Sequence, residues 1–257
     1  MNKNQDSLSG PFCPTGISIF FRSIAGAGGG VIGSILISIV FFFFSTVGGV
    51  DFVSNTAGST HPLFIFVLTI ITLIGTISAN MMSAVFISYA EPQKYNKTAS
   101  VLTQVFIINM SLFLFMIPIY VLAYAVDLNY LKIVVAAHSI ISVISSNMVL
   151  EIISDYRYSL LEIYSTIASV VFGILISIIF YFLNQTTLIF VLMPILWFSV
   201  GFFGGMVRLI YYNIYMSYGI DALSVNSGYY DYKDREKFFA ENKEKTEEEE
   251  LKEIFDE

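Results

Sequence analysis

Six long apolar stretches recur along this chain, and they constrain its fold more than any other feature of the sequence. Each is near or above the ~20 residues that a helix needs to cross a bilayer, and polar segments separate them. A backbone that crosses hydrocarbon must satisfy its own hydrogen bonds, which favours helices. The stretches span residues 31–47, 63–89, 101–126, 131–153, 163–183 and 188–216. The sequence therefore predicts an all-α, polytopic membrane protein built as one bundle of six transmembrane helices.

The composition leaves no room for a large soluble domain. Of the 257 residues, 56% are hydrophobic and only 13% are charged, whereas a soluble protein carries about 25% charged residues. We expect three parts: an N-terminal segment at 1–30, the transmembrane bundle at 31–216 and a cytoplasmic tail at 217–257.

The N-terminal segment contains an apolar stretch at 16–25 and a glycine run at 26–30. The stretch is too short to cross a bilayer, so we expect a short amphipathic helix in the membrane interface. Glycine is a poor helix former, which favours a hinge at 26–30. As an alternative, part of the run joins the first crossing, because Gly26/Gly30 and Gly29/Gly33 have the spacing of a helix-packing motif.

The distribution of basic residues predicts the orientation of the bundle. Lys and Arg collect on the cytoplasmic side of membrane proteins, and with the N-terminus inside, six of them fall in inner segments and one in an outer segment. The inner set is Lys3, Arg22, Lys94, Lys97, Arg157 and Arg208, and the outer residue is Lys132. We therefore expect both termini to be cytoplasmic, in a multi-pass protein of a prokaryotic cytoplasmic membrane.

The tail carries most of the acidity of the chain. Its part from Asp231 onward has 12 acidic and 6 basic residues, while the net charge of the whole chain is −7. The tail is either a solvated, solubilising segment or a peptide that folds on a protein partner. Nothing in the chain resembles the basic patch of a nucleic-acid-binding protein, so we expect the lipid bilayer and a protein partner or homo-oligomer, without nucleic acid.

Five polar residues are predicted to form a layer in the cytoplasmic half of the bundle. Amide and charged side chains in hydrocarbon need partners, and residues at one depth can supply one another. The layer consists of Asn80, Asn109, Asn147, Glu151 and Arg208. We expect Glu151 to pair with Arg208, and the three asparagines to complete the hydrogen bonding around that pair. The layer is read as interhelical packing or, alternatively, as a binding site or conduction path.

The stretch 131–153 also carries a polar stripe in its outer half, with His138, Ser142 and Ser145. Small residues allow helices to approach closely, and a serine hydroxyl can bond a carbonyl of its own helix. The alternative is a path for a solute. We expect His138 to be neutral and hydrogen-bonded, because no second His or Cys stands at the spacing of a metal site.

No motif in the sequence indicates a cofactor or a catalytic centre. The chain has one cysteine, Cys13, which excludes an intramolecular disulfide and a cysteine-based metal cluster. Two functions remain: a non-enzymatic subunit or scaffold of a membrane complex, and a permease-type transporter or channel. Six crossings with inside termini resemble exporter permease halves in topology only. An intramembrane enzyme is the third choice.

Overall fold

The computed structural model describes residues 13–47, 62–92, 94–95, 98–154, 158–183 and 185–218. In this part of the chain the regular elements are six α-helices, and all six are long and apolar enough to cross a membrane. They are α1 (Gly16–Val47), α2 (Pro62–Ala90), α3 (Thr98–Val126), α4 (Leu128–Ser154), α5 (Ser159–Leu183) and α6 (Gln185–Tyr218). The predicted all-α membrane bundle is therefore confirmed. Residues 1–12 and 219–257, with most of the tail, lie outside the described residues.

Helix α1 corrects the prediction for the N-terminal segment. The helix is continuous from Gly16 to Val47, so residues 16–25 are not a separate helix and no hinge interrupts α1 at 26–30. The whole glycine run instead joins the first crossing, as the alternative predicted for part of it. The glycines cost helix propensity of about 1 kcal/mol each, but they allow the backbone of α1 to touch its neighbours. A Cβ atom on Gly30 would lie 2.6 Å from the Cα of Pro194 in α6, and one on Gly33 would lie 2.5 Å from the Cβ of Ala79 in α2.

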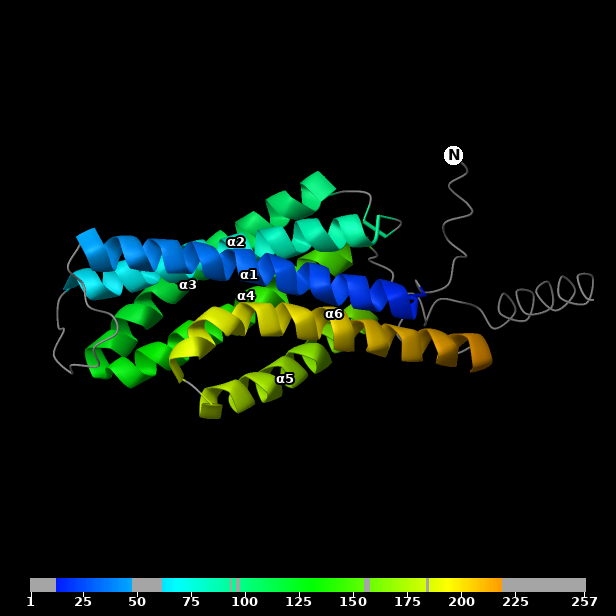
Figure 1. Ribbon diagram of the computed structural model, residues 1–257. Coiled ribbons are helices and arrows are strands. Elements are labelled where there is room, and N and C mark those ends of the chain that lie inside the picture. Colours follow the sequence, from blue (N-terminus) through cyan, green and yellow to red (C-terminus); the bar gives the residue numbers. More distant parts are fainter. Residues whose placement is uncertain are drawn as a thin grey trace, which may run out of the picture.

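Helices α1, α2 and α6 form a closely packed group (Figure 1). The glycines of α1 alternate between two neighbours: Gly26 and Gly30 meet α6, while Gly29 and Gly33 meet α2. Helix α6 also contributes glycines to this contact, since a Cβ on Gly201 would lie 2.6 Å from the Cα of Ser23 in α1. The four-residue spacing within each pair places both glycines on one face of the helix.

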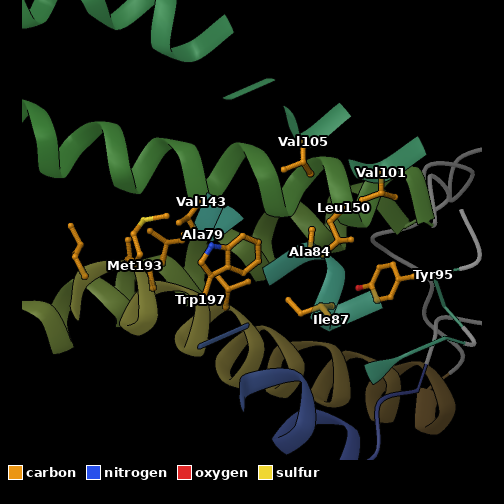
Figure 2. Close-up of a cluster of buried hydrophobic side chains, with 14 residues drawn as sticks. Ala79, Ala84, Ile87, Tyr95, Val101, Val105, Val143, Leu150, Met193 and Trp197 are labelled. Atoms are coloured by element: carbon orange, nitrogen blue, oxygen red, sulfur yellow. The ribbon is translucent and has the colours of Figure 1, made fainter. Parts of the chain in front are cut away.

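Helices α3 and α4 form a hairpin joined at Asp127, and α5 packs mainly against α6 (Figure 1). Helix α4 contacts α2, α3, α5 and α6, so the stretch with the most polar groups lies inside the bundle. The main apolar core forms around Trp197, which is fully buried with Val143 of α4 and Ala79 of α2 (Figure 2).

Candidate functional site

The carboxylate of Glu151 lies at the centre of a buried cluster of charged side chains. Glu151 is near the C-terminal end of α4 and is fully buried. Its Oε1 accepts hydrogen bonds from the Arg22 guanidinium and from the Tyr95 hydroxyl at 2.9 Å, and it forms an ion pair with Arg208 Nη1 at 3.0 Å. Its Oε2 lies 2.5 Å from Lys94 Nζ. One carboxylate therefore joins α4 to α1, to the α2–α3 connection and to α6.

A second carboxylate, that of Glu162, closes a ring with Glu151. Glu162 lies in the first turn of α5. Lys94 Nζ is 2.8 Å from its Oε1, and Arg208 Nη1 is 2.9 Å from its Oε2. Two cations and two carboxylates thus alternate around the ring, so that each charge has two neighbours of opposite sign.

Arg22 extends this ring toward α2. Its Nη1 lies 2.6 Å from Glu91 Oε2 and donates to the Tyr95 hydroxyl oxygen at 2.5 Å. We call the whole cluster the ion network: Arg22, Glu91, Lys94, Tyr95, Glu151, Glu162 and Arg208. With three cations and three carboxylates its formal charge is zero, and each charged side chain is at most 4% exposed. Such burial is tolerated only when charges are paired and hydrogen-bonded.

Two members of the ion network in the α2–α3 connection, Lys94 and Tyr95, have shifted pKa values. Burial alone would lower the pKa of the Lys94 ammonium, but Glu151 and Glu162 outweigh it and raise the pKa above its usual value. Burial raises the pKa of the Tyr95 hydroxyl, and the nearby Arg22 offsets this only in part. Around neutral pH, Lys94 is therefore a cation and Tyr95 a neutral hydrogen-bond donor.

Exposed tyrosines indicate the depth of the ion network. Tyrosine is enriched at both membrane–water interfaces, and α5 exposes Tyr164 near its start and Tyr181 near its end. At 1.5 Å per residue these two lie about 25 Å apart along the helix, which is close to the thickness of the hydrocarbon layer. Glu162 lies just before Tyr164, at the start of α5, and Glu91 lies just after the exposed Tyr89, where α2 ends. Each glutamate is therefore at the level of an interfacial tyrosine or slightly beyond it. The network therefore lies at the level of one interface.

The predicted asparagine layer divides into two separate sets. Trp197 Nε1 donates to Asn80 Oδ1 at 2.8 Å, Asn80 Nδ2 donates to Asn109 Oδ1 at 2.7 Å, and Asn109 Nδ2 donates to Ser146 Oγ at 2.8 Å. This hydrogen-bond chain connects α6, α2, α3 and α4. Asn147 is apart from it and donates to Thr166 Oγ1 of α5 at 2.7 Å.

The predicted contact between Glu151 and Arg208 is present, but its surroundings differ from the prediction. No hydrogen bond found within the described ranges joins an asparagine of the layer to either residue. Lys94 and Glu162 surround the pair instead. The physical reason is charge, because a cation bound to two carboxylates gains more than one bound to neutral amides.

The outer stripe of α4 contains a buried histidine. His138 Nδ1 lies 2.7 Å from the Tyr120 hydroxyl of α3, and no hydrogen-bond partner for its Nε2 is found among the described residues. Ser142 is buried and donates to the carbonyl of Ser139 at 2.8 Å, within its own helix, while Ser145 is half-buried. Across the described residues, no group of three or more His, Cys, Asp or Glu side chains could hold a metal ion.

The residues that sequence reasoning missed all lie near helix ends. Arg22 was assigned to an interfacial helix, while Glu91, Lys94 and Glu162 were assigned to connections. Arg22 and Glu162 are inside the bundle because α1 starts at Gly16 and α5 starts at Ser159. Glu91 and Lys94 do lie in the α2–α3 connection, but their side chains are buried against the bundle. The signal that could have found them is the mixture of acidic and basic residues in the segments at one end of the crossings.

Comparisons of this chain with protein-family models, curated proteins and solved structures find no match. The functional argument therefore rests on the geometry of the bundle alone.

Proposed function

We propose that this protein is a non-enzymatic subunit or scaffold of a membrane complex. The observation that carries the proposal is the ion network. In it, Glu151, Glu162 and Arg208 form ion pairs and hydrogen bonds with one another and with the other members of the network. A catalytic or transport site needs polar groups that are free to meet a substrate. A neutral, closed network instead fixes the mutual positions of α1, α2, α4, α5 and α6.

In this proposal the network end of the bundle faces the cytoplasm of a prokaryotic cell. The excess of Lys and Arg in the segments at that end supports the orientation. The start of α1 and the end of α6 lie at this same end (Figure 1). The tail, 217–257, then lies on the cytoplasmic side and serves to dock a protein partner.

The test is purification of the tagged full chain from its native membranes, followed by native mass spectrometry. The scaffold function predicts a stable complex with at least one other protein or with further copies of the chain. A variant ending at Tyr218 is the control, and it should keep the bundle folded but lose the partner. A lone monomer from native membranes would contradict the proposal.

A permease is the second candidate, and a specific observation favours it. In the part of the chain that the structure describes, no hydrogen-bond partner is found for His138 Nε2 or Asn147 Oδ1 of α4, although both residues are buried. Polar groups facing the interior of a bundle often mark solute paths. Solute uptake into proteoliposomes that contain only this chain would favour the permease. The same purified chain without uptake, together with a co-purifying partner, would favour the scaffold.

A further inference from the structure

The α3–α4 hairpin is attached to the rest of the bundle by different means from the other helices. Residues 98–154 contain no glycine, so the backbone contacts that lock α1 against α2 and α6 have no counterpart there. Polar side chains bridge the hairpin to its neighbours instead. Three such attachments are present: the Asn80–Asn109 hydrogen bond to α2, the Asn147–Thr166 hydrogen bond to α5, and the contacts of Glu151 with the ion network.

These three polar attachments lie in the half of the hairpin nearer the ion network. At the other end, near the Asp127 turn, the contact is mainly apolar: Met116, Tyr120 and Leu131 form a buried cluster against Leu68 of α2, where the Tyr120 hydroxyl also interacts with Thr72. An apolar contact tolerates small rotations, because its energy depends on buried area and not on direction. The hydrogen bonds to Glu151 do not tolerate such rotations, because their energy depends on direction.

Helix α4 also carries polar atoms that the observed arrangement leaves unsatisfied. His138 Nε2 and Asn147 Oδ1 are buried, and the described helices and connections offer neither a hydrogen-bond partner. A native structure rarely keeps such atoms without a reason, since each forgoes a bond that it would make in water. A second position of α4, in which water or other side chains reach these atoms, accounts for them.

We propose that the α3–α4 hairpin moves as one unit about its apolar end, and that Glu151 is the latch that holds it in the observed position. When Glu151 is neutral, Arg22, Lys94 and Arg208 lose their anion on α4. The hairpin then swings away from α2 and α6 and opens the core around Trp197. This motion serves a scaffold and a permease alike, so its test is independent of the proposed function.

Two neutral substitutions separate a latch from general loosening of the network. Glu151→Gln and Glu91→Gln each remove one negative charge from the same network. Only Glu151→Gln releases α4, because Glu91 contacts Arg22 of α1 in the network and lies just after the end of α2. The pair is therefore matched in charge and differs in the helix that is freed.

The measurement uses the accessibility of a buried position between α4 and the rest of the bundle. Val143 is fully buried and lies beside Ala79 and Trp197 (Figure 2). In a Cys13→Ser, Val143→Cys background, the rate of reaction with N-ethylmaleimide reports the open population. We expect Glu151→Gln to raise that rate about tenfold or more over the background, and Glu91→Gln to leave it within about twofold. Equal rates in the two variants would overturn the proposal.

A second pair of variants decides the matter if Glu151→Gln does not fold. Asn109→Leu removes the bond between the hairpin and α2 without burying a charge. Ser83→Ala is its control, because it removes the bond from Ser83 Oγ to the Gly26 carbonyl, between α2 and α1. Trp197 is the single tryptophan, so acrylamide quenching of its fluorescence needs no added reporter. Stronger quenching in Asn109→Leu alone supports the motion of the hairpin, and equal quenching in both variants overturns it.

Discussion

Helix α1 meets its neighbours through glycines, whereas α4 meets its neighbours through carboxylate, amide and hydroxyl groups. At Gly30 the backbone of α1 lies so close to α6 that a Cβ would be 2.6 Å from backbone atoms of Pro194. At Glu151, α4 contacts α1 and α6 through the long side chains of Arg22 and Arg208.

The two kinds of contact fail in different ways. A glycine contact in a membrane depends on shape, because lipid competes for apolar surface almost as well as another helix does. Any added volume separates the backbones. A charged contact depends on balance, since the loss of one partner leaves the other buried and unpaired. Substitutions that change only volume, or only charge, therefore distinguish α1 from α4.

The largest effect is expected from volume at the α1–α6 contact. Gly30→Ala should prevent correct folding, because backbone atoms cannot move aside as a side chain does, so the cost exceeds the usual ~1–3 kcal/mol of overpacking. Gly28→Ala is the control, as its Cβ would meet only the Phe86 ring at 3.6 Å. The yield of monodisperse protein in detergent measures the difference. Equal yields would show that the glycine contacts are not essential.

A charge swap at α4 tests whether the ion network is a pair or a shared cluster. Glu151→Arg, Arg208→Glu and the double variant should each destabilise the bundle by at least about 3–5 kcal/mol. The double variant should not recover, because an arginine at 151 faces Arg22 and Lys94, and a glutamate at 208 faces Glu162. Melting temperatures of the three variants check this. Recovery in the double variant would mean that the two residues form an isolated pair.

A balanced removal should be tolerated better than a single one. Arg22→Met leaves two cations against three carboxylates, while Arg22→Met with Glu91→Gln restores the balance and leaves the four-membered ring intact. We expect a favourable coupling of about 1–3 kcal/mol between the two changes. Thermal unfolding of the wild type, both single variants and the double variant gives this coupling energy. A value near zero would show that Arg22 acts independently of Glu91.

The smallest effect concerns a neutral contact of α4. Thr166→Val removes the acceptor for Asn147 Nδ2 and should cost about 0.6 kcal/mol, with an upper value near 1.7 kcal/mol, as for other hydrogen bonds between membrane helices. Thr103→Val is the control, since the exposed Thr103 hydroxyl bonds only the Ala99 carbonyl of its own helix. The two melting temperatures are compared directly. Equal shifts would remove this bond from the attachments of α4.

The crossings could be predicted from the sequence because hydropathy over about 20 residues reflects the thickness of a bilayer. The ends of the helices could not be predicted in the same way. Gly26–Gly30 reads as a helix breaker in isolation, but the contacts with α2 and α6 keep it helical. Tertiary packing outweighs local propensity there.

The site could be predicted only in part, for a related reason. Glu151 and Arg208 lie within apolar stretches, so their pairing follows from the cost of isolated charges. Glu91 and Lys94 lie in a short connection, and Glu162 lies in the first turn of α5. Polar residues in such places are usually solvated. Only the three-dimensional arrangement shows that this connection is folded inward.

The ion network also determines how this sequence can change over time. Its charges come from segments far apart in the chain, and each cation is shared between two carboxylates. A lineage that loses one charge must therefore lose or move an opposite charge elsewhere. Among descendants of this protein, the net charge summed over the six charged positions should be conserved more strictly than the residue at any one of them.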